Sequence, residues 1–162
     1  MNLIGKIINA MIAYYAGDVR RINHFLKVYG FAKAIGEMEG LDESTQEIIE
    51  IAALIHDIGI KNSEKKYNSS AGNYQQIEGP PEAKKLLAEL GIESGVIDRV
   101  CWLIAHHHTY TDIQGIDYQI LVEADFLVNF YEDDMSIDSV HSAGGKMFKT
   151  LSGKAILNAI YS

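Results

Sequence analysis

The chain has 162 residues, 48% of them hydrophobic and 22% charged, a composition typical of one compact domain with an ample core. Its formal net charge is −8 and it has no basic cluster, which argues against general nucleic-acid binding. The single cysteine, Cys101, has no internal disulfide partner and indicates a reducing, cytoplasmic setting, and no apolar run is long enough to span a membrane.

Residues 1–16 predict an amphipathic N-terminal helix that packs on the domain. The alternative, a targeting segment, is disfavoured because the basic region holds only Lys6 and because Asn9 interrupts the apolar stretch. The apolar face of this helix is also the one hint of a homodimer surface. That face consists of Leu3, Ile7, Ala10, Met11 and Tyr14.

A second helix is predicted over residues 18–39, with a favourable N-cap aspartate at its start and a glycine after its end. His24 interrupts the apolar face of this helix. A lone histidine in such a place is usually a core residue, so His24 becomes a candidate ligand only if partners exist elsewhere in the chain. One turn earlier, Arg20 and Arg21 could bind a substrate phosphate through bidentate contacts, or could form a solvated face.

Residues 47–61, EIIEIAALIHDIGIK, are the most informative stretch of the chain. The near-continuous apolar run predicts a buried helix, yet His56 and Asp57 stand in its last turn. Burying a carboxylate is costly unless it is paired or bound to a metal, so a compensating partner is required. Because Gly59 ends the helix only after this turn, the side chains of His56 and Asp57 can converge on one ion. Lys61 follows closely and could neutralise a phosphate or be exposed.

Residues 62–79 are polar and rich in Ser, Asn and Gly, which predicts a loop of about eighteen residues. Because this loop directly follows the His-Asp pair, we expect a lid or a substrate-specificity loop, with a disordered insertion as the alternative. Pro80 and Pro81 are then expected in the first turn of the next helix, where a missing backbone N–H is harmless.

Residues 94–108 predict a helix that ends in three consecutive histidines. One or two of them should face the inside and the third should be exposed. We expect His107, and then His106, to face inward, where either could bind a second metal ion or contact a phosphate. A polar helix end that complements the helix dipole would explain one histidine well and three poorly.

Asp125 lies in the middle of a helix predicted over residues 117–132 and is flanked by apolar residues. Because aspartate is a poor residue for a helix interior, we expect a ligand role. Asn129, one turn later, could hold a ligand or a water molecule, whereas Glu123 is expected to face outward. A last helix is predicted over residues 136–152.

Residue types that bind metals thus interrupt several apolar helices. Imidazoles and carboxylates together make a mixed nitrogen and oxygen site. Such a site suits a divalent ion such as Mn, Fe, Co, Ni, Zn or Mg better than it suits calcium, which prefers ligands that are all oxygen. One ion is expected, and a second is left open because Asp57 could bridge through its other oxygen. The candidate ligands are His24, His56, Asp57, Asp125, His106 and His107.

The order His, His-Asp, Asp, with each element on its own helix, resembles the HD superfamily of metal-dependent phosphohydrolases. LIHDIG is close to the HD signature of that superfamily, and EADFLVN resembles the helix that bears its last aspartate. The resemblance covers about His24 to Asn129. No strand or hairpin signal is present, so we expect an all-α bundle of six to eight helices in one domain, 1–162. Its motif core is 18–132, and the terminal helices pack on that core.

The resemblance implies hydrolysis of a phosphate ester in a nucleotide or another small phosphorylated metabolite. A divalent ion would lower the pKa of a water molecule and polarise a phosphoryl oxygen. The expected catalytic residues are Asp57, Lys61 and His107. The expected substrate-binding residues are Arg20, Arg21, Lys61 and Asn129.

Three departures from relatives narrow the expected function. Ile60 stands where the nucleotidase branch has a glutamate, and no Gly-Tyr-Pro follows the histidine run. The region ahead of the prolines has Gln75, Gln76 and Glu78 where relatives with two metals often have a histidine. Two other functions stay open: an HD-fold di-iron oxygenase acting on a small organic molecule, and a catalytically silent ligand sensor supported by its metal.

Overall fold

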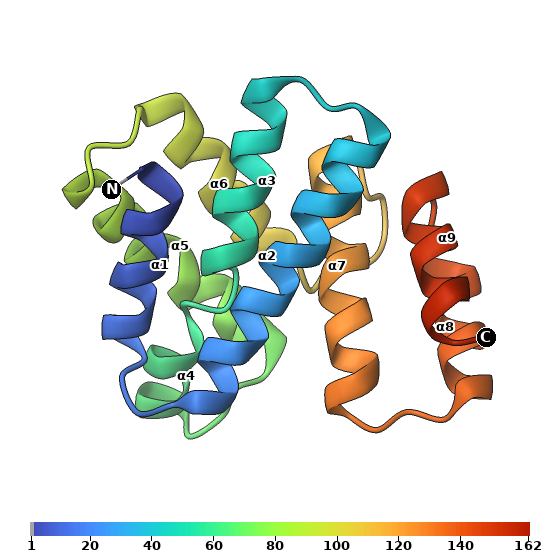
Figure 1. Cartoon of the computed structure of the whole chain (residues 1–162). Coiled ribbons are helices and arrows are strands. Elements are labelled where there is room, and N and C mark those ends of the chain that lie inside the picture. Colours follow the sequence, from blue (N-terminus) through green and yellow to red (C-terminus); the bar gives the residue numbers. More distant parts are fainter. Residues whose placement is uncertain (1) are drawn as a thin grey trace.

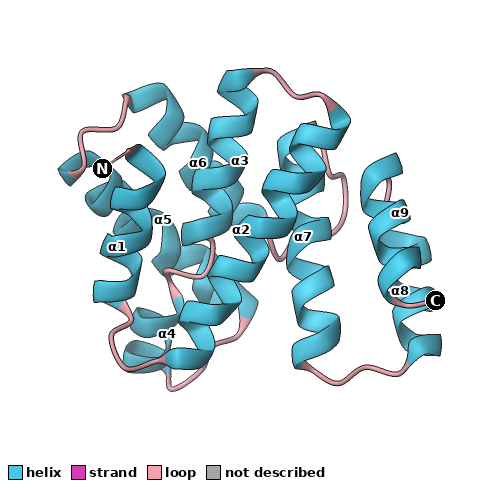
Figure 2. Ribbon diagram, in the orientation of Figure 1, coloured by secondary structure: helices cyan, strands magenta, loops and turns pink. Residues whose placement is uncertain are grey.

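The computed structural model describes residues 2–162, and every regular element within them is a helix (Figure 2). The expected all-α fold is therefore confirmed. None of the described helices combines the length and the apolar character needed to cross a bilayer. The nine helices of residues 2–162 are α1 (Leu3–Tyr14), α2 (Val19–Glu39), α3 (Glu43–Ile55), α4 (Ile60–Tyr67), α5 (Gly72–Glu89), α6 (Ser94–His106), α7 (Ile116–Glu132), α8 (Ile137–Met147) and α9 (Leu151–Ile160).

Helix α3 lies at the centre of the bundle and packs against α1, α2, α6 and α7 (Figure 1). All its residues from Ile49 to Ile55 are buried, in agreement with the near-continuous apolar run. Each buried Ile or Leu side chain contributes roughly 1.5–3 kcal/mol relative to an exposed one, so α3 is held firmly on several sides. The turn that follows its last residue is consequently well positioned for chemistry.

Helices α1 and α2 follow the predicted pattern. In α1, Ile7 and Met11 are buried and the helix packs against α3, while Met1 of the predicted 1–16 segment lies outside the described residues. In α2, the side chain of Asp18 accepts a hydrogen bond from the backbone N–H of Arg21 at 3.1 Å, as expected of an N-cap. Gly40 ends the helix in the left-handed region, with φ of 72°.

The prediction of an eighteen-residue loop over residues 62–79 is wrong. This segment forms α4 and the first part of α5, with only residues 68–71 between them. Its polar side chains stabilise the two helices by bonding to one another. The carboxylate of Glu78 accepts hydrogen bonds from Lys66 Nζ (2.9 Å) and from Tyr67 OH (3.0 Å). The hypothesis of a lid loop therefore loses its basis.

The two prolines lie inside α5 and not in its first turn, which corrects the second expectation for this region. Pro80 and Pro81 remove two backbone donors from the helix. The same part of α5 gains close packing, since a Cβ placed on Gly59 would lie only 2.6 Å from the backbone nitrogen of Gly79. Glycine at position 59 therefore lets α5 lie directly against the turn that ends α3, and Gly79 lets α5 approach Ile104 of α6.

The predicted last helix, 136–152, is divided into α8 and α9 by residues 148–150. Glu123 of α7, expected to face outward, is wholly buried beneath this junction. Its carboxylate accepts hydrogen bonds from the backbone N–H groups of Lys149 and Thr150 (both 3.2 Å) and from Thr150 Oγ1 (2.6 Å). Because Thr150 is the N-cap of α9, this carboxylate meets the positive end of the helix dipole.

Candidate metal centre

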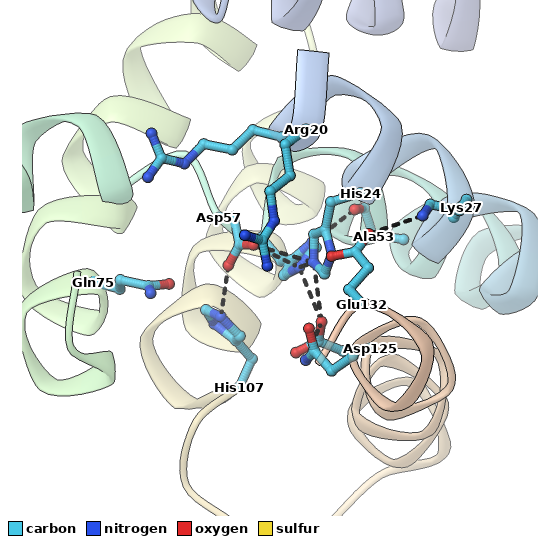
Figure 3. A network of polar contacts seen from close by, with 12 residues as sticks. Arg20, His24, Lys27, Ala53, Asp57, Gln75, His107, Asp125 and Glu132 are labelled. Carbon is cyan, nitrogen blue, oxygen red and sulfur yellow. Dashed lines mark hydrogen bonds and ion pairs between the residues drawn. The ribbon is translucent and has the colours of Figure 1, made fainter. Parts of the chain in front are cut away.

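Four side chains from α2, α7 and the turn after α3 lie close together (Figure 3). His24 comes from the buried face of α2, His56 is the C-cap of α3, Asp57 follows it, and Asp125 comes from α7. His24 Nε2 lies 3.2 Å from His56 Nε2, 3.2 Å from Asp57 Oδ2 and 3.2 Å from Asp125 Oδ1. The structure therefore brings together four candidate ligands that are up to 101 residues apart in the chain.

The two imidazole nitrogens lie at distances from each other and from the carboxylate oxygens that fit a single bound ion. Ligand atoms that each lie ~2.1 Å from one ion stand about 3.0–3.4 Å apart, in octahedral or tetrahedral geometry. His56 Nε2 is 3.3 Å from Asp57 Oδ2 and 3.4 Å from Asp125 Oδ1, within the same range. The residues present therefore fit a divalent transition metal, with His24, His56 and Asp57 as one compact group.

The hydrogen bonds of the imidazoles fix which nitrogen is free to bind an ion. His56 Nδ1 lies 2.8 Å from the carbonyl oxygen of Ala53, and His24 Nδ1 lies 2.9 Å from Glu132 Oε2. These oxygens can only accept, so each Nδ1 donates, and in the neutral ring the lone pair is left on Nε2. Two Nε2 lone pairs 3.2 Å apart repel each other unless a metal ion or a proton lies between them.

The electrostatics of the site favour a cation. Burial alone would lower the pKa of His24, but hydrogen bonds with Asp125 and Asp57 outweigh burial and raise this pKa to about 10. Burial opposes the ionised form of Asp57, yet the neighbouring His56 charge and the imidazole hydrogen bonds hold the pKa of this carboxyl well below its usual range. The two carboxylates that retain protons on the imidazoles also attract a divalent ion.

The three consecutive histidines are placed differently from the expectation that His107 and then His106 face inward. Helix α6 ends at His106, whose Nδ1 donates to the carbonyl of Trp102 (2.7 Å) and whose ring stacks on the Trp102 ring, so the structure does not bring His106 to the site. His107 is buried, and its Nε2 lies 3.5 Å from Asp57 Oδ1 with no hydrogen-bond partner among residues 2–162. His108, which sequence analysis placed outside, belongs with Asp57 and His107 to a second potential ligand group.

Gln75 joins this second group from α5. Its Nε2 donates to the carbonyl of Ser70 (2.7 Å), which turns its Oε1 toward His108 Nε2 at 2.9 Å. Its amide therefore occupies the place next to His108 where a further ligand could stand. Gln76 bonds instead to Thr109, and Glu78 is held by α4, so neither faces the site.

A cavity of about 510 Å³ opens onto the candidate ligands. Arg20 stands at its rim, largely exposed, with Asp133 as its nearest carboxylate at 4.0 Å. Arg21 also lines the cavity, but its guanidinium is bonded to Asp18 (2.9 Å) and to Glu64. The lining residues are Asp18, Arg20, Arg21, His24, Asp57, Ile60, Ser70, Gln75, His108, Asp125, Asn129, Glu132 and Asp133.

The structure places the two other expected substrate contacts in different surroundings. Asn129 lies in the cavity, and its Nδ2 donates to Asp125 Oδ1 at 3.1 Å, so it orients a candidate ligand. Lys61 turns toward α1 instead. Its Nζ donates to the carbonyl of Tyr14 (3.0 Å) and lies over the Tyr14 ring.

The support that α1 gives to the His-Asp turn was not predicted from the sequence. Tyr15 OH donates to the carbonyl oxygen of Asp57 at 2.8 Å, and Tyr14 OH donates to that of Ile58 at 3.3 Å. These carbonyls belong to the turn after α3, where the Asp57 oxygen also accepts a hydrogen bond from the backbone N–H of Ile60 at 3.0 Å. A pair of tyrosines at the end of an amphipathic helix is the only signal that the sequence offers for this role.

Comparison with known proteins agrees with this architecture. Residues 21–140 match the HD domain family. Among solved structures, the chain is similar to a predicted HD superfamily hydrolase from an uncultured Thermotogales bacterium. The TM-score is 0.70 with 22% sequence identity, over 99% of this chain and 91% of that chain, a likeness that shows a shared fold. No curated protein matches the chain. Because the family match covers most of the residues, including every candidate ligand, the chain belongs to the HD domain family.

Proposed function

We propose that the protein is a metal-dependent phosphohydrolase that cleaves a phosphate ester of a small metabolite. Membership in the HD domain family supports a metal-dependent hydrolase. The observation that carries the proposal is that the Nε2 atoms of His24 and His56 lie 3.2 Å apart and that each lies 3.2–3.4 Å from one oxygen of Asp57 and one of Asp125. The set contains no cysteine, in contrast to the thiolate-rich ligand sets usual in structural zinc sites.

When bound, the ion supplies a Lewis acid that lowers the pKa of a water molecule and polarises a phosphoryl oxygen. The chain's own residues bind and orient the substrate. The Arg20 guanidinium at the cavity rim has fewer contacts with carboxylates than that of Arg21, and a guanidinium can bind two oxygens of a phosphate. Asn129 keeps Asp125 in place through the hydrogen bond to its Oδ1.

We assign proton transfer to the Oδ1 atom of Asp57. Asp57 Oδ2 faces His24 and His56, whereas Oδ1 faces the unpartnered Nε2 of His107. A carboxylate with one oxygen free of the first ligand group can accept the proton of an attacking water, and His107 can relay it. Lys61 lies on the α1 side of the turn, so this assignment leaves it out of the chemistry.

Metal content and phosphate release test the proposal together. Mass spectrometry of purified wild-type protein should find about one transition metal per chain, and Asp57→Ala should lose it. A panel of phosphate esters assayed for inorganic phosphate then identifies the substrate. Arg20→Ala should raise KM with little change in kcat, whereas Lys61→Ala serves as the matched control, since both variants remove one exposed cation. Absence of metal, even after incubation with Mn²⁺ or Zn²⁺, would refute the proposal.

A dinuclear oxygenase is the second candidate, and the shared position of Asp57 is the observation that favours it. Asp57 belongs to both potential ligand groups, with His24 and His56 on one side and His107 and His108 on the other. Two irons per chain, together with oxygen consumption in the presence of a small organic substrate, would put this function ahead. A sensor that keeps its metal without turnover would show bound metal and no activity in either assay.

A further inference from the structure

The imidazoles at the metal centre find their Nδ1 acceptors in two different ways. His56 and His107 directly follow helix ends, and each donates to the carbonyl three residues earlier, where carbonyls of the last turn lack helical partners. His24 lies in the interior of α2, away from the helix ends where carbonyls lack partners. Its Nδ1 also needs an acceptor, and that acceptor comes from another element.

Glu132, the last residue of α7, meets this requirement. Its Oε2 lies 2.9 Å from His24 Nδ1, and its Oε1 lies 2.9 Å from Lys27 Nζ (Figure 3). His24 and Lys27 are three residues apart on α2, so both face the same carboxylate. The Glu132 side chain is only 12% exposed, so solvent screens these contacts weakly. One carboxylate thus joins α2 to α7, the two helices that carry His24 and Asp125.

We propose that Glu132 is a positioning residue of the metal centre. It holds the His24 ring in the tautomer whose Nε2 is free for the ion, and Lys27 fixes the carboxylate from its other oxygen. The inference rests on the proposed metal-dependent function and extends it to a residue outside the ligand set. A carboxylate behind a ligating imidazole increases its donor strength, and loss of such a partner typically lowers metal affinity about 10–100-fold.

Calorimetric titration of the metal-free protein with Zn²⁺ tests the assignment. Glu132→Ala should weaken binding about 10–100-fold relative to wild type. Glu132→Gln should recover part of the loss, because its amide oxygen still accepts from Nδ1 although the charge is gone. Asp133→Asn is the matched control. It removes the neighbouring carboxylate on the same rim, whose nearest cation is the exposed Arg20, so affinity should change by no more than about twofold.

A second measurement separates positioning from a general structural role. In the Zn²⁺-loaded protein, long-range ¹H–¹⁵N NMR should show protected Nδ1–H protons for His24, His56 and His107. Glu132→Ala should lose protection at His24 alone, with an unchanged circular dichroism spectrum. Equal affinity and intact His24 protection in Glu132→Ala would overturn the inference while the metal site stands. Failure of wild type to bind Zn²⁺ would instead remove the proposed function, and this inference with it.

Discussion

At the scale of single residues, the metal centre depends on which histidine nitrogen is free. His107 and His106 are neighbours in the chain, yet the end of α6 sends them to opposite surroundings. His107 is buried against Asp57, whereas His106 stacks on Trp102. Adjacent residues of the same type therefore provide an internal comparison of site and surface.

The two histidines should respond differently to removal. His107→Ala takes away the imidazole that faces Asp57 Oδ1, so phosphate release should fall roughly 10²-fold or more. His106→Ala removes only a stacked side chain and should retain wild-type activity. The measurement is kcat for both variants on the best substrate, with circular dichroism as a check of folding. Equal losses in the two variants would contradict the assignment of His107.

Metal affinity should rise with pH. Although burial opposes protonation, hydrogen bonds with Asp125 and Asp57 raise the pKa of His24 to about 10 in the metal-free protein, so an incoming ion must displace a proton at neutral pH. Affinity should increase up to about tenfold per pH unit for each proton released. Titrations between pH 6 and pH 9, in buffers with different ionisation enthalpies, count these protons. Affinity that does not depend on pH would contradict a protonated metal-free site.

The same raised pKa has a consequence for the stability of the metal-free protein, with a definite sign. A histidine whose folded pKa lies above its unfolded value stabilises the fold fully below pH ~6.5. That stabilisation is lost as the pH rises through the folded pKa of about 10. Metal-free protein should therefore become less stable from pH 7 toward pH 10 as far as His24 contributes.

At the scale of elements, carboxylates connect helices that are distant in the chain. Glu123 ties α7 to the start of α9, and Glu39 of α2 accepts a hydrogen bond from the backbone N–H of Ser152 at 2.8 Å. Both carboxylates lie at the N-terminus of α9, where the helix leaves backbone donors without partners. The last helix is therefore anchored by capping contacts as well as by apolar packing.

Removing the Glu123 carboxylate should destabilise the fold without touching the metal centre. Glu123→Ala leaves the buried N–H of Thr150 and the partly buried N–H of Lys149 without this acceptor, and the free energy of unfolding should fall by about 2–4 kcal/mol. Glu37→Ala is the control, since its carboxylate is exposed and pairs only with Lys33, and its effect should stay within about 0.5 kcal/mol. Urea unfolding of both variants makes the comparison, and similar values would argue against the buried cap.

At the scale of the whole molecule, bound metal and fold stability are linked. The candidate ligands come from α2, α7 and the turn after α3, so an ion that joins them binds only the folded chain. Each part of the bundle that carries a ligand is then restrained by the others. Stability should consequently depend on metal concentration.

Chelation should lower the melting temperature reversibly. Free metal at a thousandfold excess over Kd stabilises the folded state by about 4 kcal/mol, which corresponds to roughly 8–16 °C for a chain of this size. Differential scanning calorimetry of wild type with EDTA, and then with Zn²⁺ restored, measures the shift. Asp125→Ala should show a much smaller shift under the same conditions. Identical melting with and without metal would mean that no ion joins these helices.

The sequence by itself determined the helical class and indicated most residues of the candidate metal centre. Both follow from local rules: an apolar run predicts α3, and a carboxylate or imidazole on an apolar face requires a partner, which identified His24, Asp57 and Asp125. These residues are polar exceptions on apolar helix faces, and such exceptions can be recognised from the sequence alone. The HD signature was recognised in the same way, because LIHDIG places His56 and Asp57 at the end of an apolar run.

Only the tertiary structure decided how polar residues are used. The polar stretch 62–79 folds as helices because Glu78, Lys66 and Tyr67 satisfy one another, and such pairing leaves no periodic apolar signal. Glu123 is buried because a helix N-terminus, formed by residues at least 26 positions later, supplies its donors. Hydrogen-bond partners distant in the chain cannot be inferred from composition, whereas apolar burial repeats with the helical period and can be.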